Sequence, residues 1–129
     1  MHAEALGHVV LKVRDLQRSE GFYSGLLGMK VIARNSDPRM TFFSLGTPGN
    51  HHDFALMELG ADASAPGDCT TGLAHVAFKV GRSGRELDLV RRALADAGTV
   101  VLYEAERGFA KSVHVLDPDG NEIELYVPV

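Results

Sequence analysis

An internal repeat constrains the fold of this sequence more than any other feature. The stretch LGHVVLKV at residues 6–13 returns as LAHVAFKV at residues 73–80. Both stretches carry Leu, His, Val, Lys and Val at matched positions, and their alternation of side chains is typical of a β-strand. A repeat of this kind predicts two copies of one supersecondary unit.

Each copy continues in the same way after its first strand. Asp15 is a candidate helix N-cap and Gly28 a candidate helix stop, and Ser83 and Gly98 take the same places in the second copy. The two copies also end alike, because Met57-Glu58-Leu59 matches Ile123-Glu124-Leu125 at nearly the same offset as the first strands. Strand-like runs follow each helix at residues 29–34, 40–45 and 53–59 in the first copy and at 99–105, 112–117 and 122–127 in the second.

The order of elements in each copy is therefore β-α-β-β-β. We expect module one at residues 5–59, a Gly-, Ser- and Pro-containing linker at 60–72, and module two at 73–128. A unit of this size with one helix can hardly cover its own sheet, so the two modules should form one α+β domain. An alternative is a swapped dimer, in which each module packs against a module of the partner.

Composition excludes several classes of function. The formal net charge is −4 without a block of Lys or Arg, which argues against a nucleic-acid partner. No apolar run approaches the roughly 20 residues of a membrane span. Cys69 is the single cysteine and no apolar run opens the chain, so we expect a cytoplasmic protein without disulfides. A small molecule is the expected partner.

The matched positions of the two modules hold candidate metal ligands. His8 and His75 begin the modules, and Glu58 and Glu124 end them. Strand alternation places each His on the more polar face of its strand, and we expect these faces to line the concave side of a curved mixed sheet with the helices outside. A lone strand histidine is commonly structural, but four matched donors predict a centre for a divalent metal. His8, His75 and Glu124 would suit Fe(II) with open positions, whereas Glu58 as a fourth ligand would favour Lewis-acid chemistry.

These residues resemble the vicinal oxygen chelate superfamily, which includes glyoxalase I, extradiol dioxygenases, methylmalonyl-CoA epimerase and bleomycin or fosfomycin resistance proteins. The resemblance covers the whole chain. It is carried by the first strand and helix of module one, by the repeated strand at 73–80, and most specifically by LDPDGNEIELYV at residues 116–127. It implies two tandem βαβββ modules around a metal site.

Details of the sequence resemble the extradiol dioxygenase branch. In that branch a His stands directly before the Asp of the run that here reads HHDFALMEL, and His52 takes that position. The resemblance implies an acid/base role for His52, and alternation would put its side chain on the same face as that of Glu58. The alternative is that the loop histidines face solvent. Where single-module relatives carry a His-Gly pair and later a Tyr, this chain has Arg107-Gly108 and His114, which would contact substrate or bound oxygen.

The sequence thus predicts a metal-dependent, extradiol dioxygenase-like enzyme for a small catechol-type substrate, with Fe(II) as cofactor and a homodimer as its assembly. One alternative is a glyoxalase-type isomerase or epimerase on Ni, Zn, Mn or Co. The resemblance to glyoxalase I implies the ligand set His8, Glu58, His75 and Glu124 for that alternative. A second alternative, from another class, is a metal-free module that binds an antibiotic.

Overall fold

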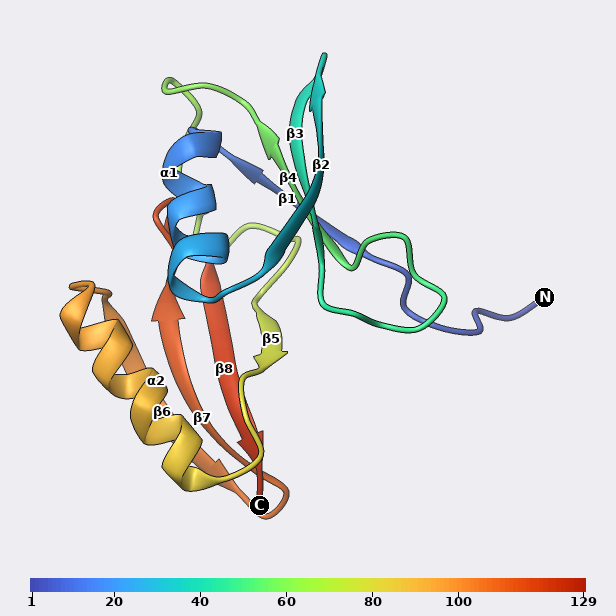
Figure 1. The fold of residues 1–129 in the computed structure, drawn as a ribbon. Helices are drawn as coiled ribbons and strands as arrows, with labels where there is room; N and C mark the ends of the chain where they lie inside the picture. Colours follow the sequence, from blue (N-terminus) through green and yellow to red (C-terminus); the bar gives the residue numbers. More distant parts are fainter. The chain divides into compact units, whose positions relative to one another are not determined.

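The chain folds into two compact units with the same order of elements. The computed structural model describes all residues from 1 to 129 and divides between Ser64 and Ala65 (Figure 1). Each unit contains a four-stranded mixed sheet and one helical segment, in the order β-α-β-β-β. This confirms the predicted α+β class with two repeated modules.

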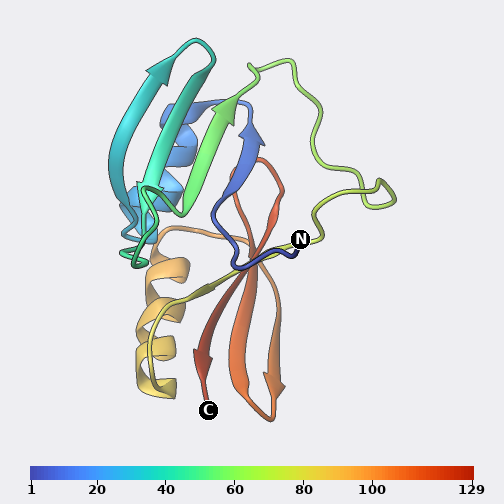
Figure 2. The same ribbon diagram turned by 90° about the vertical axis from the view of Figure 1, so that its right-hand side faces the viewer.

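In unit 1, the helical segment lies on one face of a sheet with the strand order β1-β4-β3-β2 (Figure 2). Asp15 caps this segment as predicted, because its side chain accepts a hydrogen bond from the backbone N–H of Arg18. Gly28 follows the segment with φ +72°, a conformation that favours glycine. The elements are β1 (Val9–Val13), α1 (Leu16–Glu20), the π-helical turns η1 (Gly21–Leu26), β2 (Lys30–Ser36), β3 (Arg39–Ser44) and β4 (Phe54–Glu58).

The core of unit 1 is an aromatic cluster between the helical segment and the sheet. Tyr23 and Phe54 are almost fully buried, and their ring centroids lie 4.9 Å apart. Phe43 on the neighbouring strand lies 5.9 Å from Phe54. Such pairs add about 0.5–1.5 kcal/mol each to the free energy gained by burial. The strand face that carries Phe43 and Phe54 is therefore the helix face of this sheet.

Glu20 at the end of α1 ties the helix to the sheet, and we expect Glu20→Gln to lower the free energy of unfolding by about 1 kcal/mol. Its carboxylate accepts two hydrogen bonds from Arg34 and one from Thr41. The bond from Arg34 is the main reason that the pKa of Glu20 is lowered from its usual 4.5. A lowered pKa means that this stabilisation is present above pH 4.5 and is lost as the pH falls through the folded-state pKa.

Urea unfolding at pH 7 and at pH 3 checks this prediction. The difference between the wild type and Glu20→Gln should shrink at the lower pH. A Glu4→Gln variant in the exposed N-terminal segment is the matched control. A difference that is equal at both pH values would contradict the assigned cause.

In unit 2, one long helix covers a sheet with the strand order β5-β8-β7-β6. Ser83 is the N-cap of this helix and accepts a hydrogen bond from the backbone N–H of Glu86, as the sequence predicts. Gly98 follows the helix with φ +67°. The elements are β5 (Val76–Lys79), α2 (Gly84–Asp96), β6 (Val101–Arg107), β7 (Ala110–Leu116) and β8 (Glu122–Pro128).

The core of unit 2 lies between α2 and strands β7 and β8. Leu87 and Leu94 are the buried apolar side chains of the helix. They share this core with the fully buried side chains of β7 and β8, namely Val113, Val115, Ile123, Leu125 and Val127. The residues that alternate with these, including Glu124 and the buried His114, lie on the opposite face of the sheet, which α2 does not cover and which is called the open face below. In neither unit is a helix long and apolar enough to cross a lipid bilayer.

Strand register shows that the two modules are not related by one constant spacing. Val10 pairs with Ala55 in unit 1, and its counterpart Ala77 pairs with Glu124 in unit 2. The offset from Ala55 to Glu124 is two residues longer than the offset from Val10 to Ala77. The predicted match of Glu58 with Glu124 is therefore wrong, and the counterpart of Glu124 in unit 1 is Ala55.

Candidate functional site

The two repeated histidines occupy equivalent places in their units. His8 directly precedes β1, and His75 directly precedes β5. Both strands thus begin three residues later than the repeated stretches at 6–13 and 73–80, and neither histidine lies within its strand. Partners in a parallel pair project to the same side of a sheet. His75 therefore shares the open face of unit 2 with Glu124, since Ala77 and Glu124 are partners.

His75 and Glu124 form the centre of the candidate site in unit 2. The Nε2 atom of His75 lies 3.1 Å from Oε2 of Glu124. The side chain of His75 is 39% exposed and that of Glu124 is 17% exposed, so solutes can reach this pair. A half-exposed imidazole beside a carboxylate is a donor pair that a divalent cation can use.

His114 lies beside this pair on the open face of the sheet. His114 on β7 is paired with Glu124 on β8, and its Nε2 lies 3.7 Å from Oε1 of that carboxylate. Its Nδ1 lies 3.0 Å from Oε2 of Glu122. An ionised carboxylate only accepts hydrogen bonds, so Nδ1 of His114 carries the proton. The Nε2 atom is buried without a hydrogen-bond partner, which is unusual for a polar atom inside a protein.

Tyr103 and Glu122 belong to the same cluster, although sequence reasoning did not select them. The Tyr103 ring stacks on His114 with centroids 4.2 Å apart and an interplanar angle of 16°. The Tyr103 hydroxyl lies 3.4 Å from Oε2 of Glu122, and Nδ1 of His75 lies 3.6 Å from the same oxygen. Desolvation and the charge of Glu122 raise the pKa of Tyr103. Alternation along β8 places Glu122 on the same face as Glu124. The face of Tyr103 cannot be predicted from alternation, because a bulge lies between Val101 and Tyr103.

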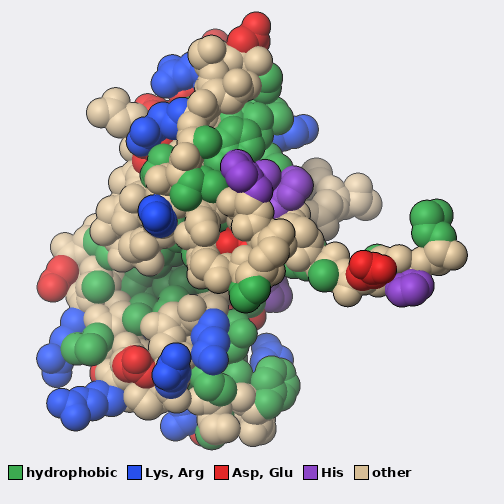
Figure 3. Space-filling view, turned by 45° about the vertical axis from the view of Figure 1, so that its right-hand side comes forward, with side chains coloured by type: hydrophobic (Ala, Val, Ile, Leu, Met, Phe, Trp, Pro, Cys, Tyr) green, Lys and Arg blue, Asp and Glu red, His purple; other side chains and the backbone are tan.

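In unit 1, His8 lies against His52, with ring centroids 4.4 Å apart. His52 also contacts Phe42 at 5.0 Å, and Phe42 pairs with Ala55 on the face opposite the helix. Figure 3 shows histidine side chains gathered on an exposed surface. Burial, followed by the nearby His8 and His51, lowers the pKa of His52. The structure thus brings His52 next to His8, and His51 is the more exposed of the two loop histidines.

His52 does not share a face with Glu58, contrary to the predicted alternation. β4 begins only at Phe54, and the side chain of the preceding Asp53 accepts hydrogen bonds from the Leu45 N–H and the Asn50 side chain. The period of two residues therefore does not extend back to His52.

Glu58 lies on the helix face of β4 and has structural partners there. Its Oε2 accepts a hydrogen bond of 2.9 Å from the backbone N–H of Leu16, the first residue of α1. Its Oε1 lies 3.1 Å from Nη1 of Arg39. The structure does not bring Glu58 to the face on which His52 contacts Phe42.

Arg107 lies at the far end of β6, outside the cluster around His75. It pairs with Ala110 beside the β6–β7 hairpin turn, four residues along the strand from Tyr103. Four residues of strand correspond to about 13 Å. The charge of Arg107 nevertheless acts on Tyr103, where it opposes the rise in the tyrosine pKa, and a contact of Arg107 with substrate stays a prediction.

The donor set of unit 2 fits a divalent metal. Two atoms bound to one metal at about 2.1 Å and at right angles lie about 3 Å apart, which matches the separation of the His75 and Glu124 donor atoms. The orphan Nε2 of His114 faces the same carboxylate. These residues are a partial set, since no group of three or more His, Cys, Asp or Glu side chains forms a complete cation site in the structure.

The family model and the similar proteins of known name point to the same superfamily. The model of the Glyoxalase/Bleomycin resistance protein/Dioxygenase superfamily matches residues 5–125. A biphenyl-2,3-diol 1,2-dioxygenase of Rhodococcus globerulus is 33% identical over 95% of this chain, which spans only 62% of that relative. A lactoylglutathione lyase of Escherichia coli O157:H7 is 31% identical, with 92% of this chain and 88% of the relative covered.

Solved structures agree with these relatives. A glyoxylase/bleomycin resistance protein/dioxygenase domain from Frankia sp. EAN1pec has a TM-score of 0.82 and 26% identity, with 99% of this chain and all of that chain covered. A fosfomycin resistance protein from Listeria monocytogenes shares the fold at 20% identity with a TM-score of 0.76, over 99% of this chain and 93% of its own, and was solved in complex with Mn(II). Members of this group thus bind divalent metals.

Proposed function

Because the chain belongs to the glyoxalase/bleomycin resistance protein/dioxygenase superfamily, we propose that it is a metal-dependent enzyme that cleaves a catechol-type ring beside its vicinal hydroxyls. The proposed ligands are His75 and Glu124 from unit 2 and His8 from unit 1, with Fe(II) as the preferred metal. The dioxygenase among the relatives supports this reaction class, although the chain spans less than two thirds of that protein.

One observation favours three protein ligands to the metal over four. The position in unit 1 that corresponds to Glu124 is occupied by Ala55, which has no donor atom. The nearby carboxylate of Glu58 already binds the start of α1 and Arg39 on the helix face. A set of two histidines and one carboxylate leaves open positions on the metal, and this arrangement is typical of Fe(II) oxygenases.

The metal, when bound, would lower the pKa of the substrate hydroxyls and hold both reactants together. The chain's own residues would then move protons. His114 is the candidate for this role, because its Nδ1 bonds to Glu122 and its Nε2 has no hydrogen-bond partner of its own. Tyr103 stacks on His114 and holds the plane of its ring. His52 beside His8 is the second candidate for proton transfer.

An aerobic assay with a panel of catechols tests the reaction. Protein loaded anaerobically with Fe(II) should consume oxygen and form coloured ring-opened products with at least one member of the panel. Protein loaded with Zn(II) is the control, because zinc has no redox chemistry. Iron bound at full occupancy without oxygen uptake across the panel would refute the proposal.

A second candidate is a glyoxalase-type isomerase, and the lactoylglutathione lyases among the relatives support it. This reading would use Glu58 as a fourth ligand and Ni, Zn, Mn or Co as the metal.

Glu58→Gln separates the two candidates. We expect metal affinity to stay within about threefold of wild type, because a carboxylate that binds the start of a helix is not available as a ligand. We expect the free energy of unfolding to fall by about 1 kcal/mol, because the charge-assisted bond to the Leu16 N–H is weakened. Metal titration and urea unfolding measure both effects. A large loss of metal affinity would favour the isomerase.

A further inference from the structure

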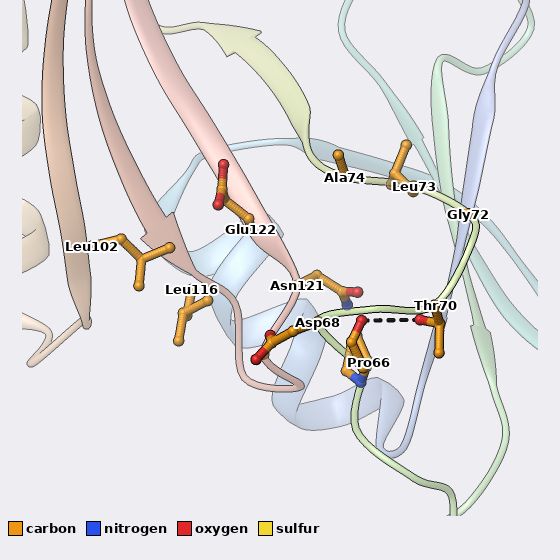
Figure 4. A pocket seen from close by; sticks show the side chains of 12 residues that line it. Pro66, Asp68, Thr70, Gly72, Leu73, Ala74, Leu102, Leu116, Asn121 and Glu122 are labelled. Atoms are coloured by element: carbon orange, nitrogen blue, oxygen red, sulfur yellow. Dashed lines mark hydrogen bonds between the residues drawn. The ribbon is translucent and has the colours of Figure 1, made fainter.

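Unit 2 contains a pocket beside the candidate site, and no step of the proposed reaction takes place in it. It has a volume of about 490 Å³ and is lined by the chain before β5 and by the ends of β6, β7 and β8 (Figure 4). This volume is within the range of small-molecule sites. Figure 4 shows Leu102 and Leu116 on one side, Leu73 and Ala74 on the other, and Glu122 between them.

Leucine side chains line part of the pocket, polar groups line the larger part, and its charges are negative. Leu73 and Leu102 are 56% and 43% exposed, so their side chains are accessible to a molecule in the pocket. Asp68 and Glu122 are its ionisable residues, and none of the twelve lining residues is Lys or Arg. An anionic ligand would find no cation here, whereas a neutral or cationic ligand would meet no repulsion.

Glu122 connects this pocket with the candidate site. The same carboxylate that lines the pocket accepts the hydrogen bond from Nδ1 of His114 and lies 3.4 Å from the Tyr103 hydroxyl. The bulge between Val101 and Tyr103 contains Leu102, so one irregularity of β6 sets both the stacked tyrosine and a wall of the pocket. A molecule bound beside His75 and Glu124 can therefore extend its far end into this pocket.

We infer that the pocket holds the ring substituent of the substrate and selects an aromatic whose substituent is neutral or cationic, against one that carries a carboxylate, sulfonate or phosphate. This inference rests on the proposed function for the identity of the reacting end. It separates this chain from enzymes whose substrates are recognised through an anionic group, because such recognition relies on Arg or Lys in the pocket.

Three monophenols of similar size test the inference without any ring cleavage. Tyramine is cationic, 4-ethylphenol is neutral and 4-hydroxyphenylacetate is anionic, and none has the vicinal hydroxyls that the proposed reaction needs. Titration into the ¹⁵N-labelled protein should shift the amides of Leu73, Leu102 and Leu116 with tyramine and 4-ethylphenol. With two carboxylates nearby, 4-hydroxyphenylacetate should bind at least about tenfold more weakly than tyramine.

Two variants complete the test. Asp68→Asn should weaken tyramine about threefold and leave 4-ethylphenol unchanged, because one charge is removed without a change of shape. Asp62→Asn, an exposed position outside the pocket, is the matched control and should change neither affinity. Leu102→Trp should fill the pocket and weaken tyramine and 4-ethylphenol together.

The outcomes separate this inference from the proposed function. Equal affinities for tyramine and 4-hydroxyphenylacetate, amide shifts outside the lining residues, or no binding of any probe would overturn the pocket assignment. Charge-dependent binding in a protein that cleaves no catechol would uphold the pocket and reject the ring-cleavage reaction.

Discussion

His75→Ala is expected to lower the affinity for a divalent metal by more than about 100-fold and to abolish catalysis that depends on it. Residues that only orient a metal ligand commonly contribute about 10- to 100-fold, so loss of a direct ligand should exceed this range. His75 contributes the Nε2 atom that lies 3.1 Å from Glu124. Isothermal titration with Mn(II) or anaerobic Fe(II), followed by elemental analysis of the purified protein, measures the loss.

The variant should remain folded, which makes the metal measurement interpretable. The His75 side chain is 39% exposed and lies outside the buried core. The thermal midpoint of unfolding without metal should therefore stay within a few degrees of wild type. His51→Ala is the matched control, since His51 is an exposed histidine of the loop before β4. Metal affinity that survives in His75→Ala would remove the ligand set on which the proposed function depends.

His8→Ala extends this test to the ligand that we propose from unit 1. It should lower metal affinity as far as His75→Ala does. A mixture of the two variants distinguishes a site built within one chain from one built across a swapped dimer. In the swapped arrangement each mixed dimer regains one of its two sites, so about a quarter of the wild-type metal content should return in an equal mixture with random pairing, whereas sites within single chains stay empty.

The sequence predicted the elements of both modules, because each is marked by a strong local signal. Asp15 and Ser83 cap the helices through their own side chains, and a positive φ at Gly28 and Gly98 ends the helical segments. The repeated histidines were found for the same reason, since the strands that follow them retain the alternation of apolar residues.

The position of Glu58 could not be predicted, because strand register depends on tertiary pairing rather than on local sequence. The segments before the last strands differ in length between the modules, which lengthens the spacing between their counterparts by two residues. The similar strings Met57-Glu58-Leu59 and Ile123-Glu124-Leu125 align Glu58 with Glu124 in the sequence, but the two residues do not occupy equivalent positions in the sheets. A shift of an odd number of residues moves a side chain to the other face of a sheet.

Glu122 and Tyr103 show the same limit in unit 2. Their contacts with His114 join three strands, and those contacts exist only once β6, β7 and β8 are paired with a bulge in β6. Sequence reasoning found His114 through the family resemblance, but nothing local to His114 identifies the carboxylate that fixes its proton.

His114→Phe is expected to lower kcat by about 10²- to 10⁴-fold while metal affinity stays within a few fold of wild type. Phenylalanine keeps a ring that can stack on Tyr103 but has no atom that can exchange a proton. The effect on stability should be small because two contributions oppose each other. Removal of the buried, unpartnered Nε2 favours the folded state, whereas loss of the bond to Glu122 disfavours it, and each contributes about 1–3 kcal/mol.

His114→Tyr is the matched variant that isolates the proton. It differs from His114→Phe by one hydroxyl group, and the resemblance to extradiol dioxygenases places a Tyr at this position in related single-module enzymes. We therefore expect His114→Tyr to recover at least about tenfold of the kcat lost in His114→Phe. Steady-state kinetics with the catechol that the panel identifies, together with metal titration of both variants, measure the difference. Equal kcat values for the Phe and Tyr variants would show that His114 acts through packing against Tyr103 rather than through proton transfer.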